Sequence, residues 1–176
     1  MILKIPDNYI QQGSLVALRA KSFDDLYNDY RWRKDVELAK YDATRPLNIS
    51  FENFVKRFND EFSVDTNERQ IFSIESIMNK KHIGNIMYYS FDTKKKNVEM
   101  GITIGERSYW NQGYGTESVL LFLEFLFSFK NIKSVYLHTL EWNDRARLSF
   151  LKSGFQEIKR IRRLGYTFIK MEIQKN

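Results

Sequence analysis

Trp110-Asn111-Gln112-Gly113-Tyr114-Gly115-Thr116-Glu117 is the stretch of this sequence that decides its fold. It lies between a strand-like run and a strongly apolar, helix-like run. Glycines at alternate positions let the backbone approach a ligand closely, and the start of the following helix offers unpaired N–H groups and a positive dipole end. The stretch lacks the Lys-Ser/Thr pair of a P-loop and the third glycine of a dinucleotide fingerprint. It therefore predicts a different kind of backbone cradle for a pyrophosphate group.

The segments on either side of this cradle predict a strand, a helix and a second strand. Residues 98–104 have the composition of a strand, residues 116–129 form an apolar helix, and residues 135–142 form the next strand. A strand–helix–strand unit within one sheet makes a right-handed parallel crossover. The sequence therefore predicts one parallel strand pair next to the cradle.

The rest of the chain predicts an antiparallel sheet with helices. Further strands are expected at 15–19, 71–77, 82–91, 156–162 and 167–173, with hairpin tips at 79–81, 94–96 and 164–165. Helices are expected at 23–38, at 50–62 after a Ser50 cap, and at 144–152 before Gly154. The predicted class is α+β: a mixed, mostly antiparallel sheet of about seven strands flanked by about four helices, in a single domain spanning residues 1–176.

Composition narrows the classes of function. The chain has 176 residues, 43% hydrophobic and 28% charged, which is the balance of a globular protein. It has no cysteine, which excludes disulfides, thiolate metal sites and a cysteine nucleophile. The first twenty residues contain no continuous apolar run typical of export signals, and the longest apolar stretch, 119–129, is too short to cross a bilayer. We therefore expect a cytoplasmic protein without a membrane partner.

The net charge of +6 suits an anionic partner, either nucleic acid or a small ligand with several phosphates. The run at 94–96 reads as a solvated hairpin tip, and the cations near 159–163 could either contact phosphate or protect an edge strand. No nucleic-acid-binding motif is present, so nucleic acid is the weaker interpretation.

Two motifs resemble one known family. The runs at 98–105 and 109–117 are similar to the coenzyme-binding motif of the GNAT superfamily of N-acetyltransferases, Gln/Arg-x-x-Gly-x-Gly/Ala, with Trp110 in the position of the Gln or Arg. Asn143-x-x-Ala146, Lys152 and Gly154-Phe155 are similar to the closing motif of that family. The Leu-Arg pair at 18–19 and the helix with Trp32 look most like the branch of ribosomal-protein alanine, spermidine and amino-sugar acetyltransferases.

The resemblance implies the GNAT fold, acetyl-CoA as co-substrate with no metal, and direct attack by a primary amine. The acceptor stays open between a protein N-terminus, a polyamine, an amino sugar and another small amine, and a homodimer also stays open. The residues that the resemblance assigns to acetyl-CoA are Gly101, Ile102, Thr103, Asn111, Gln112, Gly113, Tyr114, Gly115, Thr116, Asn143, Ala146, Phe150 and Lys152.

Two residues are candidates for the base that deprotonates the amine. Glu99 stands fourteen residues before Gly113, the position of the base in histone-type members of the family. By strand alternation its side chain shares a face with residues 101 and 103; the alternative is a solvated strand glutamate. His138 is the rival, five residues before Asn143, where some protein N-terminal acetyltransferases of the family carry a glutamate; a structural histidine is the alternative. Tyr88 and Glu141 are weaker candidates for the acceptor side.

Phe150 occupies the position at which many family members carry a tyrosine thought to protonate the departing thiolate. Phenylalanine has no proton to give, so the acid could be another residue, water or the ammonium proton. Besides the enzyme, two interpretations stay open: a non-catalytic acyl-CoA sensor on the same fold, since fold does not fix function, and a nucleic-acid-binding module.

Overall fold

The computed structural model describes residues 9–63 and 69–175, and the described strands form one eight-stranded sheet. The expectation about an export signal falls partly on residues 1–8, outside the described residues. The strand order is β1-β2-β3-β4-β5-β6-β8-β7, and every neighbouring pair is antiparallel except β5 and β6. The strands are β1 (Tyr9–Gln12), β2 (Val16–Ala20), β3 (Arg69–Ser76), β4 (His82–Asp92), β5 (Asn97–Ile104), β6 (Ser134–Leu140), β7 (Gln156–Arg163) and β8 (Tyr166–Gln174).

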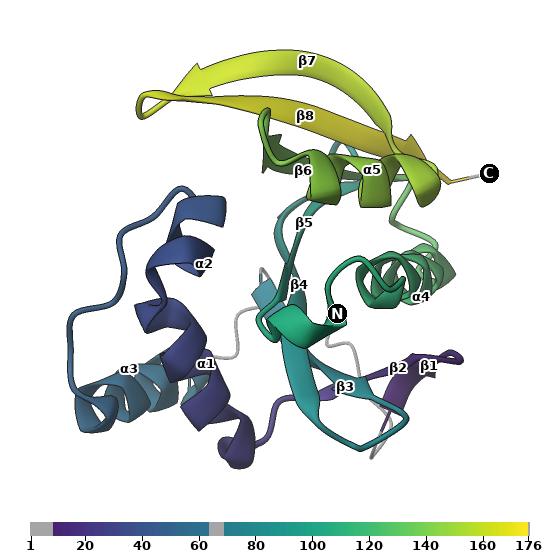
Figure 1. Cartoon of the computed structure of the whole chain (residues 1–176). Helices are drawn as coiled ribbons and strands as arrows, with labels where there is room; N and C mark the ends of the chain where they lie inside the picture. Colours follow the sequence, from purple (N-terminus) through teal and green to yellow (C-terminus); the bar gives the residue numbers. More distant parts are fainter. Residues whose placement is uncertain (1–8, 64–68, 176) are drawn as a thin grey trace.

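The helices lie on both sides of this sheet (Figure 1). They are α1 (Leu26–Lys34), α2 (Val36–Tyr41), α3 (Phe51–Ser63), α4 (Tyr114–Ser128) and α5 (Asp144–Lys152), with short 3₁₀ turns at Phe23–Asp25 and Arg107–Tyr109. Helix α4 packs across β1, β2, β4 and β5, and α1 and α2 lie on the opposite side of the sheet. The predicted α+β class and the predicted parallel crossover from β5 through α4 to β6 are confirmed.

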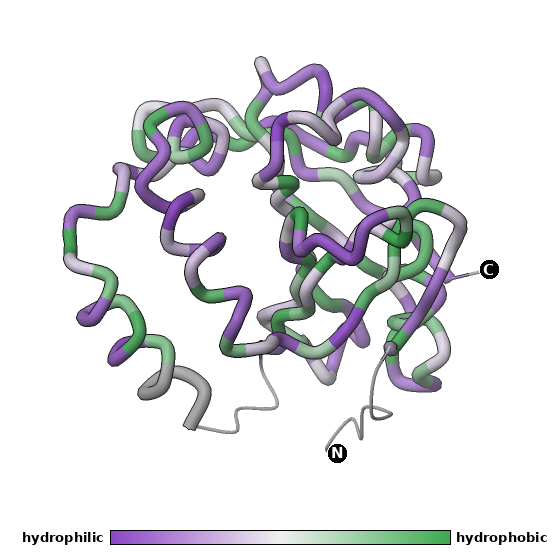
Figure 2. The backbone as a smooth tube through the Cα atoms, turned by 60° about the horizontal axis from the view of Figure 1, so that its bottom comes forward, coloured by the Kyte–Doolittle hydropathy of each residue, from purple (hydrophilic) through white to green (hydrophobic). Residues whose placement is uncertain are grey.

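The core explains why α4 is apolar almost all round. Its Phe122 and Leu126 are fully buried against the sheet, where Phe72 of β3 packs edge-on against Phe122 at 5.7 Å between ring centroids. Helix α3, in contrast, is amphipathic, and hydrophobic and hydrophilic positions alternate along it in Figure 2. Its Phe51 and Phe54 pack against Tyr30 of α1, with centroid distances of 5.3 and 5.6 Å. Helices α1 and α3 therefore pack on each other through a cluster of aromatic rings.

Three details differ from the sequence prediction. Strand β1 was missed because Tyr9–Gln12 is short and polar and places only Ile10 against the core. The helix expected at 23–38 is broken at Asp35, whose extended backbone (ψ 123°) ends α1 and whose carboxylate accepts hydrogen bonds from the N–H groups of Glu37 and Leu38. Helix α4 begins at Tyr114 rather than at residue 116, so the second glycine of the cradle lies inside its first turn.

Candidate active site

Strands β5 and β6 separate beside a cavity. Their parallel pairing covers Asn97–Ser134, Val98–Val135 and Glu99–Tyr136, and beyond that point β5 and β6 no longer pair with each other, although β5 stays paired with β4 and β6 with β8. A cavity of about 610 Å³ opens there, and both diverging strands line it, β5 with residues 99–104 and β6 with residues 137–140. The rest of the wall comes from α1, α2 and the loop after it, β4, the segment before α4 and its first turn, α5 and the β7–β8 hairpin.

The split leaves backbone donors of β5 without a strand partner. Gly105 N donates to Ile83 O on β4 at 2.9 Å, so antiparallel alternation directs the N–H groups of Gly101 and Thr103 to β4 as well. The N–H groups of Met100 and Ile102 then point the other way, toward the open split. Donors on the wall of a cavity can polarise a carbonyl oxygen that lies between the two strands.

The cradle is the first turn of α4. Gly113 has φ of +89°, a conformation that favours glycine, and it caps the helix without a side chain. Glu117 N donates to Gly113 O at 2.9 Å, which leaves the N–H groups of residues 114–116 without a helical acceptor. At Gly115, an added Cβ would have its nearest heavy atoms, Ile104 Cγ1 and Ser149 Oγ, at 3.7 and 3.9 Å. A methyl group would fit there, so the glycine leaves this part of the cavity wall, beside the free donors, without a side chain.

Glu117 fixes this turn to the sheet. Its carboxylate accepts hydrogen bonds from the N–H groups of Ser14, Leu15 and Val16 at 2.7–3.0 Å and from Ser14 Oγ at 2.6 Å. Burial alone would raise the pKa of Glu117, but these hydrogen bonds hold it below its usual value. Gly13 makes the contact possible, because a Cβ there would lie 2.6 Å from the carboxyl carbon. The cradle is therefore positioned by a charged side chain that turns away from the cavity.

The two candidate bases meet at the point where the strands separate. Glu99 Oε1 lies 2.6 Å from His138 Nδ1, and both side chains line the cavity. The described residues give Nε2 of His138 no hydrogen-bond partner. The pair thus has the arrangement in which a carboxylate holds one ring nitrogen and leaves the other free.

Two tyrosines surround the same carboxylate. Tyr89 Oη lies 3.5 Å from Glu99 Oε1, and Tyr136 packs edge-on against the His138 ring at 5.8 Å. Burial, and then the negative charge of Glu99, raise the pKa of both Tyr89 and Tyr136 to about 12. Both phenols therefore stay protonated at neutral pH, so Tyr89 can act only as a donor toward Glu99 in that range.

Most of the predicted site residues line the cavity, but two do not. Gln112 is exposed and its side-chain amide donates to Ser108 O, while Tyr114 is buried in the core, edge-on to Tyr109 at 4.8 Å. Only their backbone can serve the cradle. The predicted residues that line the cavity are Glu99, Gly101, Ile102, Thr103, Asn111, Gly113, Gly115, Thr116, His138, Asn143, Ala146, Phe150 and Lys152.

Several lining residues were missed by the sequence prediction. Tyr89, not its neighbour Tyr88, faces the cavity, since Tyr88 is buried on the other face of β4. Glu141 does not line it either and pairs with Arg160 at 2.5 Å. The missed residues belong to α1, α2 and their following loop, β4, α5 and the last hairpin: Arg33, Tyr41, Asp42, Thr44, Met87, Tyr89, Arg145, Arg163 and Phe168. No motif marks them, because they meet only through packing between distant elements.

Neither a metal-binding cluster nor a membrane-spanning helix occurs in the described part of the chain. Residues 9–63 and 69–175 contain no group of three or more His, Asp or Glu side chains placed to hold a metal ion. None of the described helices is both long and apolar enough to cross a bilayer.

The comparison with protein families identifies the class of protein. Residues 14–156 match the acetyltransferase (GNAT) domain family, and because the match covers most of the chain, the chain belongs to that family. The predicted superfamily is confirmed, and acetyl-CoA is the co-substrate that the family uses. The open cradle at the start of α4 fits the pyrophosphate of that molecule. No curated protein sequence matches the chain.

Solved structures share the fold. The spermidine N-acetyltransferase from Vibrio cholerae, in complex with CoA and spermine, has a TM-score of 0.79 at 21% identity, with 92% of this chain and 96% of that chain covered. The aminoglycoside acetyltransferase AAC(6')-Ib with coenzyme A has a TM-score of 0.75 at 17% identity, covering 91% and 95%. An acetyltransferase (GNAT family) from Bacillus anthracis has a TM-score of 0.76 at 15% identity, covering 93% and 97%.

Proposed function

We propose that this chain transfers the acetyl group of acetyl-CoA to a primary amine by direct attack, with Glu99 and His138 acting as one unit. The observation that carries the proposal is the 2.6 Å contact between these two side chains on the cavity wall, where β5 and β6 separate. Bound acetyl-CoA supplies an acetyl thioester to this point.

His138 takes the amine proton in this proposal. An amine is mostly protonated near neutral pH and must lose a proton before it can attack a carbonyl carbon. Glu99 accepts the Nδ1–H of His138 and so keeps the lone pair of Nε2 free toward the cavity. Glu99 is then a positioning residue, and Tyr89 supports its charge as a donor.

The backbone of β5 stabilises the charge that develops on the carbonyl oxygen. The N–H groups of Met100 and Ile102 face the split, close in the chain to Glu99. As the new C–N bond forms, negative charge moves onto the oxygen, and fixed donors aimed at it lower the barrier. The C–S bond then breaks, the thiolate leaves, and the proton taken from the amine stays on His138 until it passes to solvent.

The wall of the cavity carries side chains of both charges. Asp42 and Glu99 line it together with Arg33 and Arg163. Burial raises the pKa of Asp42 above its usual value, and the charge of Arg33 opposes this change. The mixed charge is compatible with a primary amine on a small molecule or on a peptide.

Turnover measured with an amine panel tests the proposal. The panel contains spermidine, kanamycin and a peptide with a free N-terminus, and release of free thiol is followed. We expect His138→Ala to lower kcat by about a hundredfold or more, because general base catalysis is lost. Added imidazole should restore part of the rate. Glu99→Ala should lose less, and the double variant no more than His138→Ala alone, because residues that act as a unit are not additive.

Calorimetric titration of acetyl-CoA into each variant is the control, because neither side chain belongs to the cradle and affinity should be kept. A larger loss in Glu99→Ala than in His138→Ala would make Glu99 the direct base. A wild-type chain that binds acetyl-CoA tightly and acetylates no amine in the panel would favour the acyl-CoA sensor instead.

A further inference from the structure

Arg145 stacks on the residue that departs from the family motif. Trp110 stands where that motif has Gln or Arg, so the cation or amide expected there is missing. The guanidinium carbon of Arg145 lies 3.3 Å from the centroid of the Trp110 ring and 4.8 Å from that of Tyr41. The Trp110 ring is held in turn by its Nε1–H, which donates to Ile104 O at 2.7 Å. The loop before α4 has no cation at position 110, but the guanidinium of Arg145 from α5 lies on the face of the Trp110 indole ring.

The charge of Arg145 is not neutralised by the protein. No carboxylate in the described part of the chain forms an ion pair with it, although its side chain is half-buried and lines the cavity. Glu37 is close enough to act on it electrostatically but binds Arg107 instead, at 2.9 Å. Burial therefore lowers the pKa of Arg145, since nearby charges compensate only in part. A partly desolvated guanidinium of this kind is a ready site for an anion.

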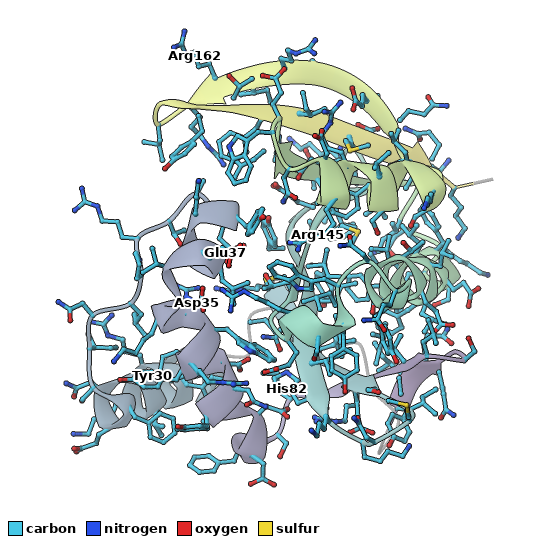
Figure 3. The ribbon with its side chains drawn as sticks, viewed as in Figure 1. Tyr30, Asp35, Glu37, His82, Arg145 and Arg162 are labelled. Atoms are coloured by element: carbon cyan, nitrogen blue, oxygen red, sulfur yellow. The ribbon has the colours of Figure 1, made fainter. Side chains whose placement is uncertain are left out.

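The position of Arg145 on α5 connects it to the cradle. Residues four apart lie on the same helix face, so Arg145 is one turn from Ser149. Ser149 Oγ lies 2.9 Å from Thr116 Oγ1 at the start of α4, beside the open N–H groups. Lys152, three residues further, lines the same cavity. Figure 3 shows Arg145 reaching from α5 into the space between α5 and α2.

We propose that Arg145 binds the pyrophosphate of acetyl-CoA and replaces, from another helix, the side chain that the family motif places at position 110. The proposal rests on the acetyl-CoA site described above. Trp110 and Tyr41 then act as the platform that holds the planar guanidinium in place, since stacking on aromatic rings leaves its N–H donors free for phosphate oxygens. In this proposal the phosphate contact comes from Arg145 on α5, and Trp110 supports that side chain in place of making the contact itself.

Calorimetric titration with CoA and with dephospho-CoA, which lacks the 3′-phosphate, tests this contact. Arg145→Ala should raise Kd about 10- to 100-fold, and by the same factor for both ligands, since hydrogen bonds to charged groups are worth about 1.5–3 kcal/mol. Arg147→Ala is the matched control: this arginine is on the same helix, pairs with Glu157 at 2.7 Å and lies outside the cavity, so Kd should not change. Adding Trp110→Arg to Arg145→Ala should restore affinity.

The outcomes separate this proposal from the proposed function. Unchanged Kd in Arg145→Ala, with a wild-type chain that binds CoA, would overturn the arginine contact and leave the acetyltransferase proposal intact. A loss for CoA alone would place Arg145 on the 3′-phosphate and overturn the pyrophosphate assignment. A wild-type chain that binds neither ligand would contradict the acetyl-CoA site itself. Thermal unfolding of each variant checks that the fold is kept.

Discussion

The two histidines of this chain both lie beside carboxylates, but in opposite surroundings. His82 is nearly closed to solvent between α1 and the sheet (Figure 3), with Nδ1 3.4 Å from Asp25 and Nε2 3.1 Å from Asn85 Oδ1. His138 opens to the cavity, and its carboxylate partner Glu99 lies there too. A histidine enclosed by fixed charges contributes to stability, whereas one with a free ring nitrogen at a cavity is available for proton transfer.

The surroundings of His82 form a buried charge network, which we define as Arg19, Lys21, Asp25, Asp29, Glu75 and His82. Arg19 binds Asp25 through two hydrogen bonds of 2.8 Å and binds Glu75 at 2.7 Å. Lys21 pairs with Asp29 at 2.5 Å, and Ser73 donates to Asp25 at 2.6 Å. The buried charge network therefore joins β2, β3 and β4 to the helical segment that leads to the cavity wall.

Removing a carboxylate from each region should give the largest contrast. Asp25→Ala should lower the free energy of unfolding by about 3–5 kcal/mol, because it removes a carboxylate partner of the Arg19 guanidinium in a buried position. Glu99→Ala should cost much less, since its partner His138 is open to the cavity. Urea denaturation measures both, with the exposed neighbour Asp24→Ala as control, expected within about 0.5 kcal/mol of wild type. Equal losses in Asp25→Ala and Glu99→Ala would remove the distinction.

Two glycines extend the comparison to packing. A Cβ at Gly105 would lie 2.0 Å from the buried ring of Trp32, which itself packs 4.8 Å from His82. Gly105→Ala should therefore cost roughly 1–3 kcal/mol of stability through overpacking. Gly115→Ala should keep or raise stability, since alanine favours helix, yet weaken CoA binding because the methyl group occupies the cradle. Urea denaturation and calorimetric titration with CoA measure both variants. A loss of CoA affinity in Gly105→Ala with unchanged stability, or a loss of stability in Gly115→Ala with unchanged affinity, would contradict this assignment.

Acid should destabilise the buried charge network through His82. Burial, and the charge of Lys21, lower the pKa of His82, while Asp25 and Asp29 oppose this change. Above about pH 6.5 the ring is neutral in both states; below it the unfolded chain binds a proton that the folded chain does not. The free energy of unfolding should thus fall from pH 7 toward pH 5, with a slope of at most about 1.4 kcal/mol per pH unit for this one proton.

Urea denaturation across that range measures the slope, and His82→Gln should flatten it. A second loss belongs to Asp25, at lower pH. Burial would raise the pKa of this carboxyl, but hydrogen bonds from Arg19 and Ser73 lower it, so its contribution is present above about pH 4 and is lost below. The same slope in His82→Gln and wild type above pH 5 would assign the acid sensitivity to another group.

The sequence predicted those features of the candidate site that depend on local backbone geometry. Gly113 and Gly115 mark the cradle because a positive φ and an open helix start are properties of a few neighbouring residues. The contact between Glu99 and His138 was not predictable from spacing, because it depends on the register that pairs Glu99 with Tyr136 across β5 and β6. Both residues were candidates, but as rivals; the structure makes them neighbours.

Contacts between distant elements account for what the sequence missed. Arg145 contacts Trp110 only because α5 packs beside the loop before α4, and neither residue type by itself predicts that contact. The buried charge network has the same origin, since Asp25 and Ser73 are 48 positions apart in the chain. The break at Asp35 differs from these cases, because it has a local signal: aspartate is among the preferred residues at a helix start.

The smallest effect is expected on the cavity wall, at Phe150, where the family often has tyrosine. Phe150 is buried and packs against Phe155 at 5.9 Å, so its ring contributes to packing. A thiol has a pKa of about 8.5, so a thiolate leaves readily near neutral pH without a dedicated acid. Phe150→Tyr should then change kcat by less than about tenfold, under about 1.4 kcal/mol of activation free energy. Phe150→Leu is a control for packing: it should lower the free energy of unfolding modestly and should change kcat by no more than Phe150→Tyr does. A large gain in kcat for Phe150→Tyr, with CoA affinity unchanged, would mean that proton delivery to the sulfur limits the reaction, and that His138 governs a step that is not the slowest.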